Sequence, residues 1–153
     1  MAINYTALGH VALRCRDYQK MLDFYVKKLG CEELFHLDND DGSLWLTYVR
    51  TAKGQFVELF PEDYPGDNDA LKQSPHHFCF EVDDFAGFVR QLRERGVTVY
   101  DGPANTHPVM AGEPEDRARG MCGSLCAFIQ DPEGNDIEIM QFTDASMQLI
   151  CDR

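Results

Sequence analysis

Hydrophobic and polar positions along the chain predict the same order of secondary-structure elements twice. Residues 7–14 alternate with a period of two, which is typical of a strand with one buried face. Residues 18–30 carry apolar side chains at helical spacing, with Asp17 as an N-cap before them and Gly30 as a C-terminal stop. Three apolar runs follow, with turn-rich segments between them: EELFHL, SLWLTYV and QFVELF. The first half therefore predicts a βαβββ order.

The stretch HHFCFEVDDFAGFVRQLRERG begins this order again. A strand headed by His77 is followed by an aspartate cap, Asp83 or Asp84, and then by a helical stripe that ends at Gly96. Three more strands are expected after this helix: VTVY, GSLCAFIQD and NDIEIMQF. The second half also predicts a βαβββ order.

The expected fold class is therefore α+β, built from two βαβββ modules. We place the modules at residues 5–61 and 75–143, with a connector at 62–74. The second module is longer because residues 105–121 contain proline and glycine and have no periodicity. We interpret that segment as a loop, and long loops in compact domains are often functional.

Composition narrows the classes of function. The chain has 153 residues, 44% of them hydrophobic, which suffices for a sizeable core. A formal net charge of −12 without a basic cluster argues against nucleic acid and membrane partners. The sequence shows neither a membrane span nor a signal peptide, so a cytoplasmic protein with reduced cysteines is expected.

Four polar residues interrupt apolar strands at matching points of the two copies: His10, Glu58, His77 and Glu138. A single one of them is ordinary on a half-exposed sheet, where polar side chains face solvent. Repetition favours convergence, because pseudo-twofold packing of the copies would bring all four together. His76 is a rival to His77, but alternation favours His77; His36 and His107 have no counterpart and are interpreted as ordinary polar residues.

Two imidazoles and two carboxylates form a nitrogen and oxygen donor set with a charge near −2, which suits one divalent cation. The set contains no thiolate, so the pattern predicts an open, catalytic kind of site for Ni²⁺, Zn²⁺, Co²⁺, Mn²⁺ or Fe²⁺.

The chain resembles the vicinal oxygen chelate superfamily, which includes glyoxalase I, methylmalonyl-CoA epimerase, extradiol dioxygenases and antibiotic-resistance proteins. The resemblance spans roughly Leu8 to Phe142. The segments that carry it are GHVALRCRDYQKMLDFYVKKLG, FVELF, HHFCFEVDD and FIQDPEGNDIEIMQ.

This resemblance implies a cup-shaped sheet with outer helices, a metal at its base, and a homodimer that acts on a small-molecule substrate. The family's metal ligands fall on His10, Glu58, His77 and Glu138, and its catalytic base falls on Glu138. Arg14 matches the position of an arginine near glutathione in glyoxalase I. The segment LFPEDYP after Glu58 departs from glyoxalase I and is closer to the epimerase branch.

The expected activity is that of a glyoxalase I-like lyase, in which a base removes a proton beside a carbonyl and a divalent metal stabilises the enediolate. A methylmalonyl-CoA epimerase-like reaction uses the same donors, but an acidic chain without a basic cluster is poorly suited to coenzyme A. A ring-cleaving dioxygenase needs two histidines and one carboxylate, one ligand fewer than here. A non-catalytic, bleomycin resistance-like binder would lack the ligand set.

In the loop at residues 105–121, Arg117 and Arg119 are candidate anion contacts.

Overall fold

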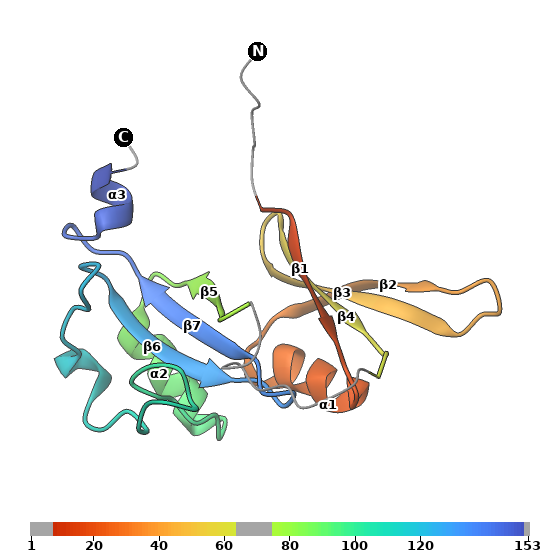
Figure 1. Cartoon of the computed structure of the whole chain (residues 1–153), viewed down its shortest axis with the longest axis horizontal. Coiled ribbons are helices and arrows are strands. Elements are labelled where there is room, and N and C mark those ends of the chain that lie inside the picture. The colour runs from red at the N-terminus through yellow and green to blue at the C-terminus, as the bar shows by residue number, and fades with distance from the viewer. Residues whose placement is uncertain (1–7, 64–74, 152–153) are drawn as a thin grey trace, which may run out of the picture. The chain divides into compact units, whose positions relative to one another are not determined.

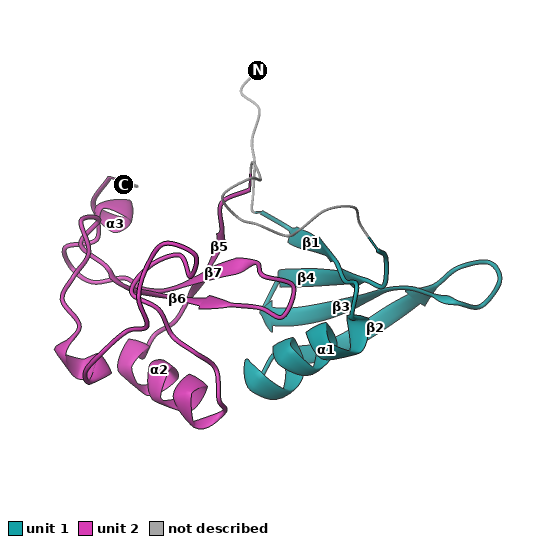
Figure 2. Ribbon diagram, turned by 60° about the horizontal axis from the view of Figure 1, so that its bottom comes forward, with its two compact units in different colours: residues 1–66 teal, residues 67–153 magenta. Residues whose placement is uncertain are grey.

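The computed structural model describes residues 8–63 and 75–151. The chain divides into two compact units, unit 1 (residues 1–66) and unit 2 (residues 67–153), which Figure 2 colours separately. Most of the expected connector lies outside the described residues. Each unit is a sheet with helices of its own (Figure 1).

Unit 1 has the predicted βαβββ order. Its elements are β1 (His10–Arg14), α1 (Tyr18–Asp23), η1 (Phe24–Lys28), β2 (Glu32–Asp38), β3 (Leu44–Ala52) and β4 (Gln55–Phe60). The strand order in the sheet is β1-β4-β3-β2, with β1 and β4 parallel and the other neighbours antiparallel. The first and last strands of the unit, β1 and β4, are therefore neighbours in the sheet.

The helix of unit 1 begins and ends where its sequence predicts. The Asp17 carboxylate accepts a hydrogen bond from the Lys20 backbone N–H at 3.1 Å, so it caps α1. The helix then widens into the π-turn of η1, where the Leu29 N–H donates to the Phe24 carbonyl at 3.0 Å. Gly30 follows with φ of 77°, a left-handed conformation that ends the helix.

Unit 2 repeats the arrangement with a shorter sheet. Its elements are β5 (Phe78–Glu81), α2 (Phe85–Glu94), η3 (Pro114–Asp116), β6 (Leu125–Gln130), β7 (Asp136–Gln141) and α3 (Met147–Cys151). The strand order is β5-β7-β6, with β5 and β7 parallel and β6 and β7 antiparallel. Asp84, rather than Asp83, is the cap of α2, because its carboxylate accepts from the Gly87 N–H at 2.9 Å.

The prediction of a strand over residues 97–100 of unit 2 is wrong, because most of this segment forms no strand pairing. Only Tyr100 forms bridges, to Phe128 of β6 and to Val109. The reason is that neighbouring backbone groups bind the loop instead: the Met110 N–H donates to the Val99 carbonyl at 2.9 Å. Tyr100 still occupies the position beside β6 that β2 occupies beside β3, so the duplicated order persists as a single bridge.

One face of each sheet carries the core. In unit 1 the Tyr18 hydroxyl of α1 lies 2.6 Å from Thr47 Oγ1 of β3, which places the helix on the face of the odd-numbered residues of β3 and β4. In unit 2 the Phe85 N–H of α2 donates to Gln141 Oε1 of β7 at 2.7 Å, again on the odd-numbered face. The buried apolar residues of these faces include Val49, Val57, Leu59, Ile137 and Ile139. The expected α+β class, with helices packed against mixed sheets, is confirmed.

Within residues 8–63 and 75–151, no helix has the length and apolar character that a bilayer crossing requires.

Candidate functional site

The site-bearing face of unit 1 is the one turned away from α1. Strand register places Glu58 of β4 between Ala12 of β1 and Tyr48 of β3, and directly paired residues share a face of the sheet. His10 lies two residues before Ala12 and therefore projects from the same face. The predicted pair His10 and Glu58 is thus brought together by the parallel pairing of β1 with β4.

The contact within this pair is short enough to share a ligand or an ion. His10 Nε2 lies 3.6 Å from Glu58 Oε2, with the Glu58 side chain 8% exposed and the His10 side chain 49% exposed. The Tyr48 hydroxyl hydrogen-bonds to the same carboxylate, and this bond is the first cause of the raised pKa of Tyr48. Tyr48 is also in edge contact with the His10 ring, at a centroid distance of 6.5 Å. A buried carboxylate, an imidazole and a phenol therefore form one cluster.

Unit 2 repeats the pair at the same register. Glu138 of β7 lies between Cys79 of β5 and Phe128 of β6. His77, two residues before Cys79, has its Nε2 3.3 Å from Glu138 Oε2. The side chains are 31% exposed for His77 and 14% for Glu138, and the His77 ring is in edge contact with Phe128. Each unit therefore carries one histidine and one glutamate in the same relation to its strands.

His76 is placed differently from its neighbour. Its Nδ1 lies 2.7 Å from Nδ1 of His77, so one ring donates to the other. The contact with Glu138 is made by Nε2 of His77, the histidine that strand alternation favours.

The donor pairs fit a divalent metal in chemistry and spacing. Imidazole nitrogen and carboxylate oxygen bind such ions at about 2.0–2.2 Å, so two neighbouring ligands lie roughly 3 Å apart. The observed separations, 3.6 Å for His10 with Glu58 and 3.3 Å for His77 with Glu138, are close to this value. No group of three or more His, Cys, Asp and Glu side chains in the described part of the chain is arranged to hold an ion. One unit thus supplies half of the predicted ligand set.

Arg14, the predicted substrate contact, projects from the same face of β1 as His10. Its Nε lies 3.4 Å from Glu62 Oε2, and both side chains are more than half exposed. The guanidinium group therefore already has a carboxylate partner, although an exposed pair of this kind is weak.

Comparison with known proteins assigns the chain to a family. A family model described as the Glyoxalase/Bleomycin resistance protein/Dioxygenase superfamily matches residues 7–139. The chain belongs to this superfamily. The superfamily resemblance expected from the sequence is confirmed.

Relatives within the superfamily bear different names. The lactoylglutathione lyase of Escherichia coli O157:H7 is 28% identical over 145 residues, covering 93% of this chain and 97% of that protein. The structure of a glyoxalase family protein from Enterococcus faecalis has a TM-score of 0.66 at 22% identity and covers 89% of this chain and 98% of its own. TnmS3, an antibiotic binding protein from Streptomyces sp. CB03234, has a TM-score of 0.60 at 24% identity and covers 93% and 100%. The structural neighbours show the fold alone, so the function must be argued from the site.

Two thiols also contact Glu138, although the four predicted ligand residues include no cysteine. Cys79 faces it from β5 and Cys126 from β6, and both thiols hydrogen-bond to its carboxylate. Burial first, and then the charge of Glu138, raises the pKa of Cys79 to about 12 and also raises that of Cys126. Cys122 contacts Cys126, while backbone hydrogen bonding at Ser124 lowers the pKa of Cys122. Strand alternation alone places Cys79 on the face of His77, which is the signal that could have found it.

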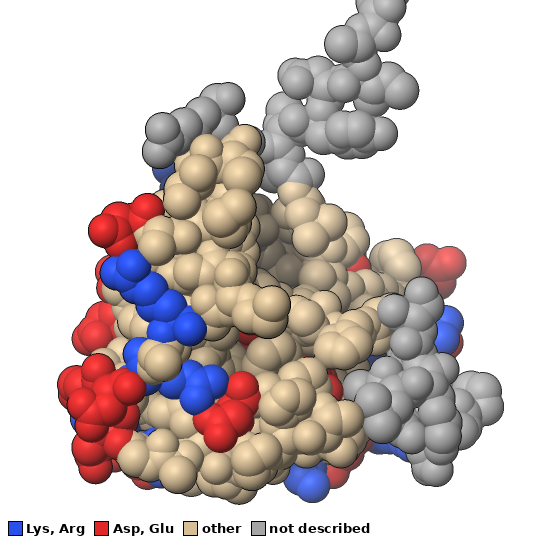
Figure 3. All heavy atoms as spheres, turned by 60° about the vertical axis from the view of Figure 1, so that its left-hand side comes forward, with Lys and Arg blue, Asp and Glu red and all other residues tan. Residues whose placement is uncertain are grey.

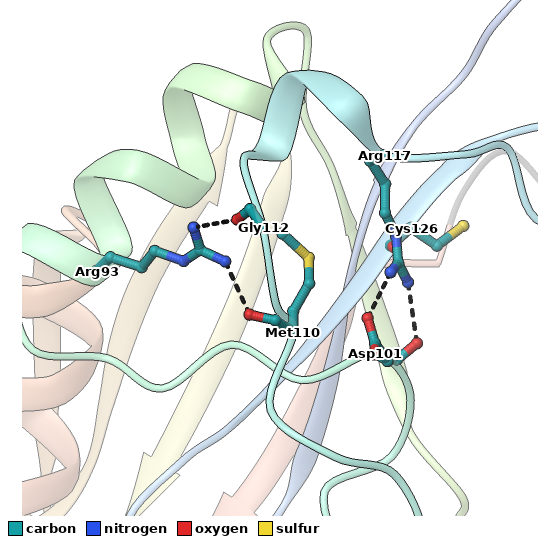
Figure 4. Close-up of polar contacts among 6 residues, drawn as sticks. All are labelled: Arg93, Asp101, Met110, Gly112, Arg117 and Cys126. Carbon is teal, nitrogen blue, oxygen red and sulfur yellow. Dashed lines mark hydrogen bonds and ion pairs between the residues drawn. The ribbon is translucent and has the colours of Figure 1, made fainter.

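The predicted loop, residues 105–121, is held to unit 2 by two arginines (Figure 4). Arg93 of α2 donates to the carbonyls of Met110 and Gly112, each at 3.0 Å. Arg117 donates to the Cys126 carbonyl at 2.9 Å and forms an ion pair with Asp101. Arg117 thus ties the loop to the backbone of β6 at Cys126.

The candidate anion contacts of the loop are paired internally. Besides Arg117 with Asp101, Arg119 lies 2.9 Å from Asp144. On the face that Figure 3 presents, basic side chains lie beside acidic ones in the same way. The charges of these arginines are therefore largely balanced before any ligand arrives.

Proposed function

We propose that this protein is a metal-dependent, glyoxalase I-like lyase that moves a proton between the two carbons next to vicinal oxygens of a small substrate. The observation that supports this most is the repetition of one His–Glu pair at the same strand register in both units. Ordinary solvated strand faces have no reason to repeat both residue types and their contact. The superfamily and the lactoylglutathione lyase relative support the same class.

In this proposal His10, Glu58, His77 and Glu138 hold one divalent ion, with the two pairs supplied by one chain or by two chains of a homodimer. When bound, the ion supplies Lewis-acid stabilisation for negative charge that develops on the substrate oxygens. The protein residues would hold the substrate with its reacting carbons beside a carboxylate.

The two glutamates have different partners, and this difference favours Glu138 as the base. The Tyr48 hydroxyl of β3 donates a hydrogen bond to Glu58. The residue at the matching position of β6 is Phe128, which has no hydroxyl. The partners of Glu138 are thiols, which are weak hydrogen-bond donors. Glu138 is also the more exposed of the two, at 14% against 8%. We therefore assign proton removal and return to Glu138.

The direct test is Glu138→Gln with the hemithioacetal of methylglyoxal and glutathione as substrate. Loss of the base is expected to lower turnover about 10²–10⁴-fold, while the amide oxygen keeps a donor for the ion. Glu81→Gln is the matched control. Glu81 of β5 lies on the same face of the sheet as Glu138, so this substitution also removes one carboxylate from that face but should leave turnover unchanged. Full activity of Glu138→Gln would remove this residue from the mechanism.

Methylmalonyl-CoA should be assayed in parallel, since the segment after Glu58 departs from glyoxalase I. Faster turnover of the acyl-CoA than of the hemithioacetal would assign the chain to the epimerase alternative.

A further inference from the structure

The two histidines before β5 make a contact that strand geometry alone does not produce. Neighbouring residues of an extended strand point to opposite faces of the sheet. His76 and His77 precede β5, which begins at Phe78, and their rings meet. Nδ1 of one ring lies 2.7 Å from Nδ1 of the other, and the ring planes are inclined at 77°. The chain before β5 therefore turns the ring of His76 onto that of His77.

His77 consequently has a partner on each ring nitrogen. Its Nε2 lies 3.3 Å from Glu138 Oε2, and its Nδ1 is in hydrogen-bond contact with His76. The edge contact with Phe128, at a centroid distance of 5.1 Å, further restricts the ring. Since Nε2 faces the carboxylate of the proposed metal site, Nδ1 is the nitrogen left for a supporting hydrogen bond.

Unit 1 has a different arrangement at the matching position. Gly9 is the counterpart of His76, because each directly precedes the histidine of its unit. In the described part of the chain, the contacts of the His10 side chain are with Glu58 and Tyr48. A Cβ built on Gly9 meets no heavy atom within 4 Å, so a side chain would fit there. The duplicated fold therefore accommodates a residue before the histidine but does not require an imidazole.

We propose that His76 is a positioning residue for the metal ligand His77. Its Nδ1 accepts a hydrogen bond from the Nδ1–H of His77, which leaves Nε2 of His77 as the bare nitrogen that faces Glu138. This inference rests on the proposed function, because it takes His77 as a ligand.

The chemistry of coordination decides the direction of this hydrogen bond. A neutral imidazole has one N–H, and the nitrogen that binds an ion cannot carry that hydrogen. When Nε2 of His77 is the ligand, its proton is on Nδ1, and His76 is the acceptor within reach. The proton of His76 itself then lies on Nε2 of an exposed residue.

The opposite direction would block the site. If His76 donated the hydrogen bond, the proton of His77 would lie on Nε2, which would then have no lone pair for an ion. An acceptor at Nδ1 removes this competing tautomer. Partners of this kind orient metal-binding histidines, and their loss typically lowers metal affinity about 10–100-fold. His76 thus acts through His77 and not on the ion.

Two substitutions of His76 and one control test this role. His76→Phe keeps a ring but has no acceptor, whereas the amide oxygen of His76→Asn can accept in place of Nδ1. Gly9→Ala changes the matching position of unit 1, where there is room, and is the control. Because His76 is exposed, its substitutions should leave the fold intact.

The first measurement is the affinity of the full chain for Zn²⁺, by competition with a chromophoric chelator. We expect His76→Phe to bind Zn²⁺ about 10–100-fold more weakly than the native protein does. His76→Asn should recover most of this loss, and Gly9→Ala should bind Zn²⁺ as tightly as the native protein.

The second measurement is independent of affinity. NMR spectra of the histidine side chains, with both rings neutral, report which ring nitrogen carries the proton. In the metal-free native protein we expect the proton of His77 on Nδ1 and that of His76 on Nε2. In His76→Phe the form of His77 with its proton on Nε2 should increase.

The outcomes separate this inference from the proposed function. Native protein that binds no Zn²⁺ overturns the proposed function and the inference with it. Native protein that binds Zn²⁺, with His76→Phe binding equally tightly, overturns the inference alone. A loss of affinity that His76→Asn does not restore makes the role of the ring steric and also overturns it. Spectra with the proton of native His77 on Nε2 overturn it whatever the variants bind.

Discussion

Single side chains differentiate two otherwise matching pairs. At the position next to each glutamate, unit 1 has Tyr48 and unit 2 has Phe128. The Tyr48 hydroxyl hydrogen-bonds to Glu58, whereas the hydrogen-bond partners of Glu138 are thiols. Such a division is what a shared site needs if one carboxylate is to remain a ligand and the other is to move a proton. Neither Tyr48 nor Phe128 could be identified from the sequence as the neighbour of a glutamate, because the pairing of distant strands decides which residue lies beside it.

Cys31 yields a prediction that is independent of the site. Burial raises the pKa of its thiol from the ordinary 9.0 to about 11. Between these values the unfolded chain loses the proton and the folded chain keeps it, so folding becomes less favourable as the pH rises. We expect the difference in unfolding free energy between the native protein and Cys31→Ala to shrink across this pH window, as measured by urea titration. A constant difference would contradict a partly buried thiol that stays protonated.

At the scale of elements, local signals were sufficient for most of the fold. Alternation and helical spacing, together with Asp17 and Gly30, predicted unit 1 in the observed order. Prediction failed at residues 97–100, which have strand-forming side chains but whose backbone groups bind the loop. Alternation indicated that the glutamates lie opposite the helices. It could not indicate that β5 and β1 each pair with the last strand of their unit, which brings histidine to glutamate.

The cap of α2 can be tested with a matched pair of aspartates. Asp84→Ala removes the acceptor of the Gly87 N–H, so unit 2 should be destabilised by about 1 kcal/mol. Asp83→Ala, one residue earlier, is the control and should have a smaller effect. The measurement is the urea midpoint of unfolding. Equal effects of the two substitutions would show that the cap contributes little.

At the scale of the whole molecule, the proposed metal site needs the donor pairs of two units to hold one ion. Each unit supplies a histidine and a glutamate, and two donors of this kind are too few for a stable site. Duplication solves this problem, because a second copy of the same register provides the missing pair. The proposed homodimer and the single-chain arrangement differ only in which copies are combined.

Metal stoichiometry tests this central claim most directly. Elemental analysis after loading with Ni²⁺ or Zn²⁺ and desalting should find one ion per chain in the native protein. His10→Ala and His77→Ala, in separate units, should each lose that ion, while His36→Ala, an exposed histidine 3.9 Å from Asp38, should keep it. Full metal content in either the His10 or the His77 variant, or two ions per native chain, would contradict a centre shared by the two pairs.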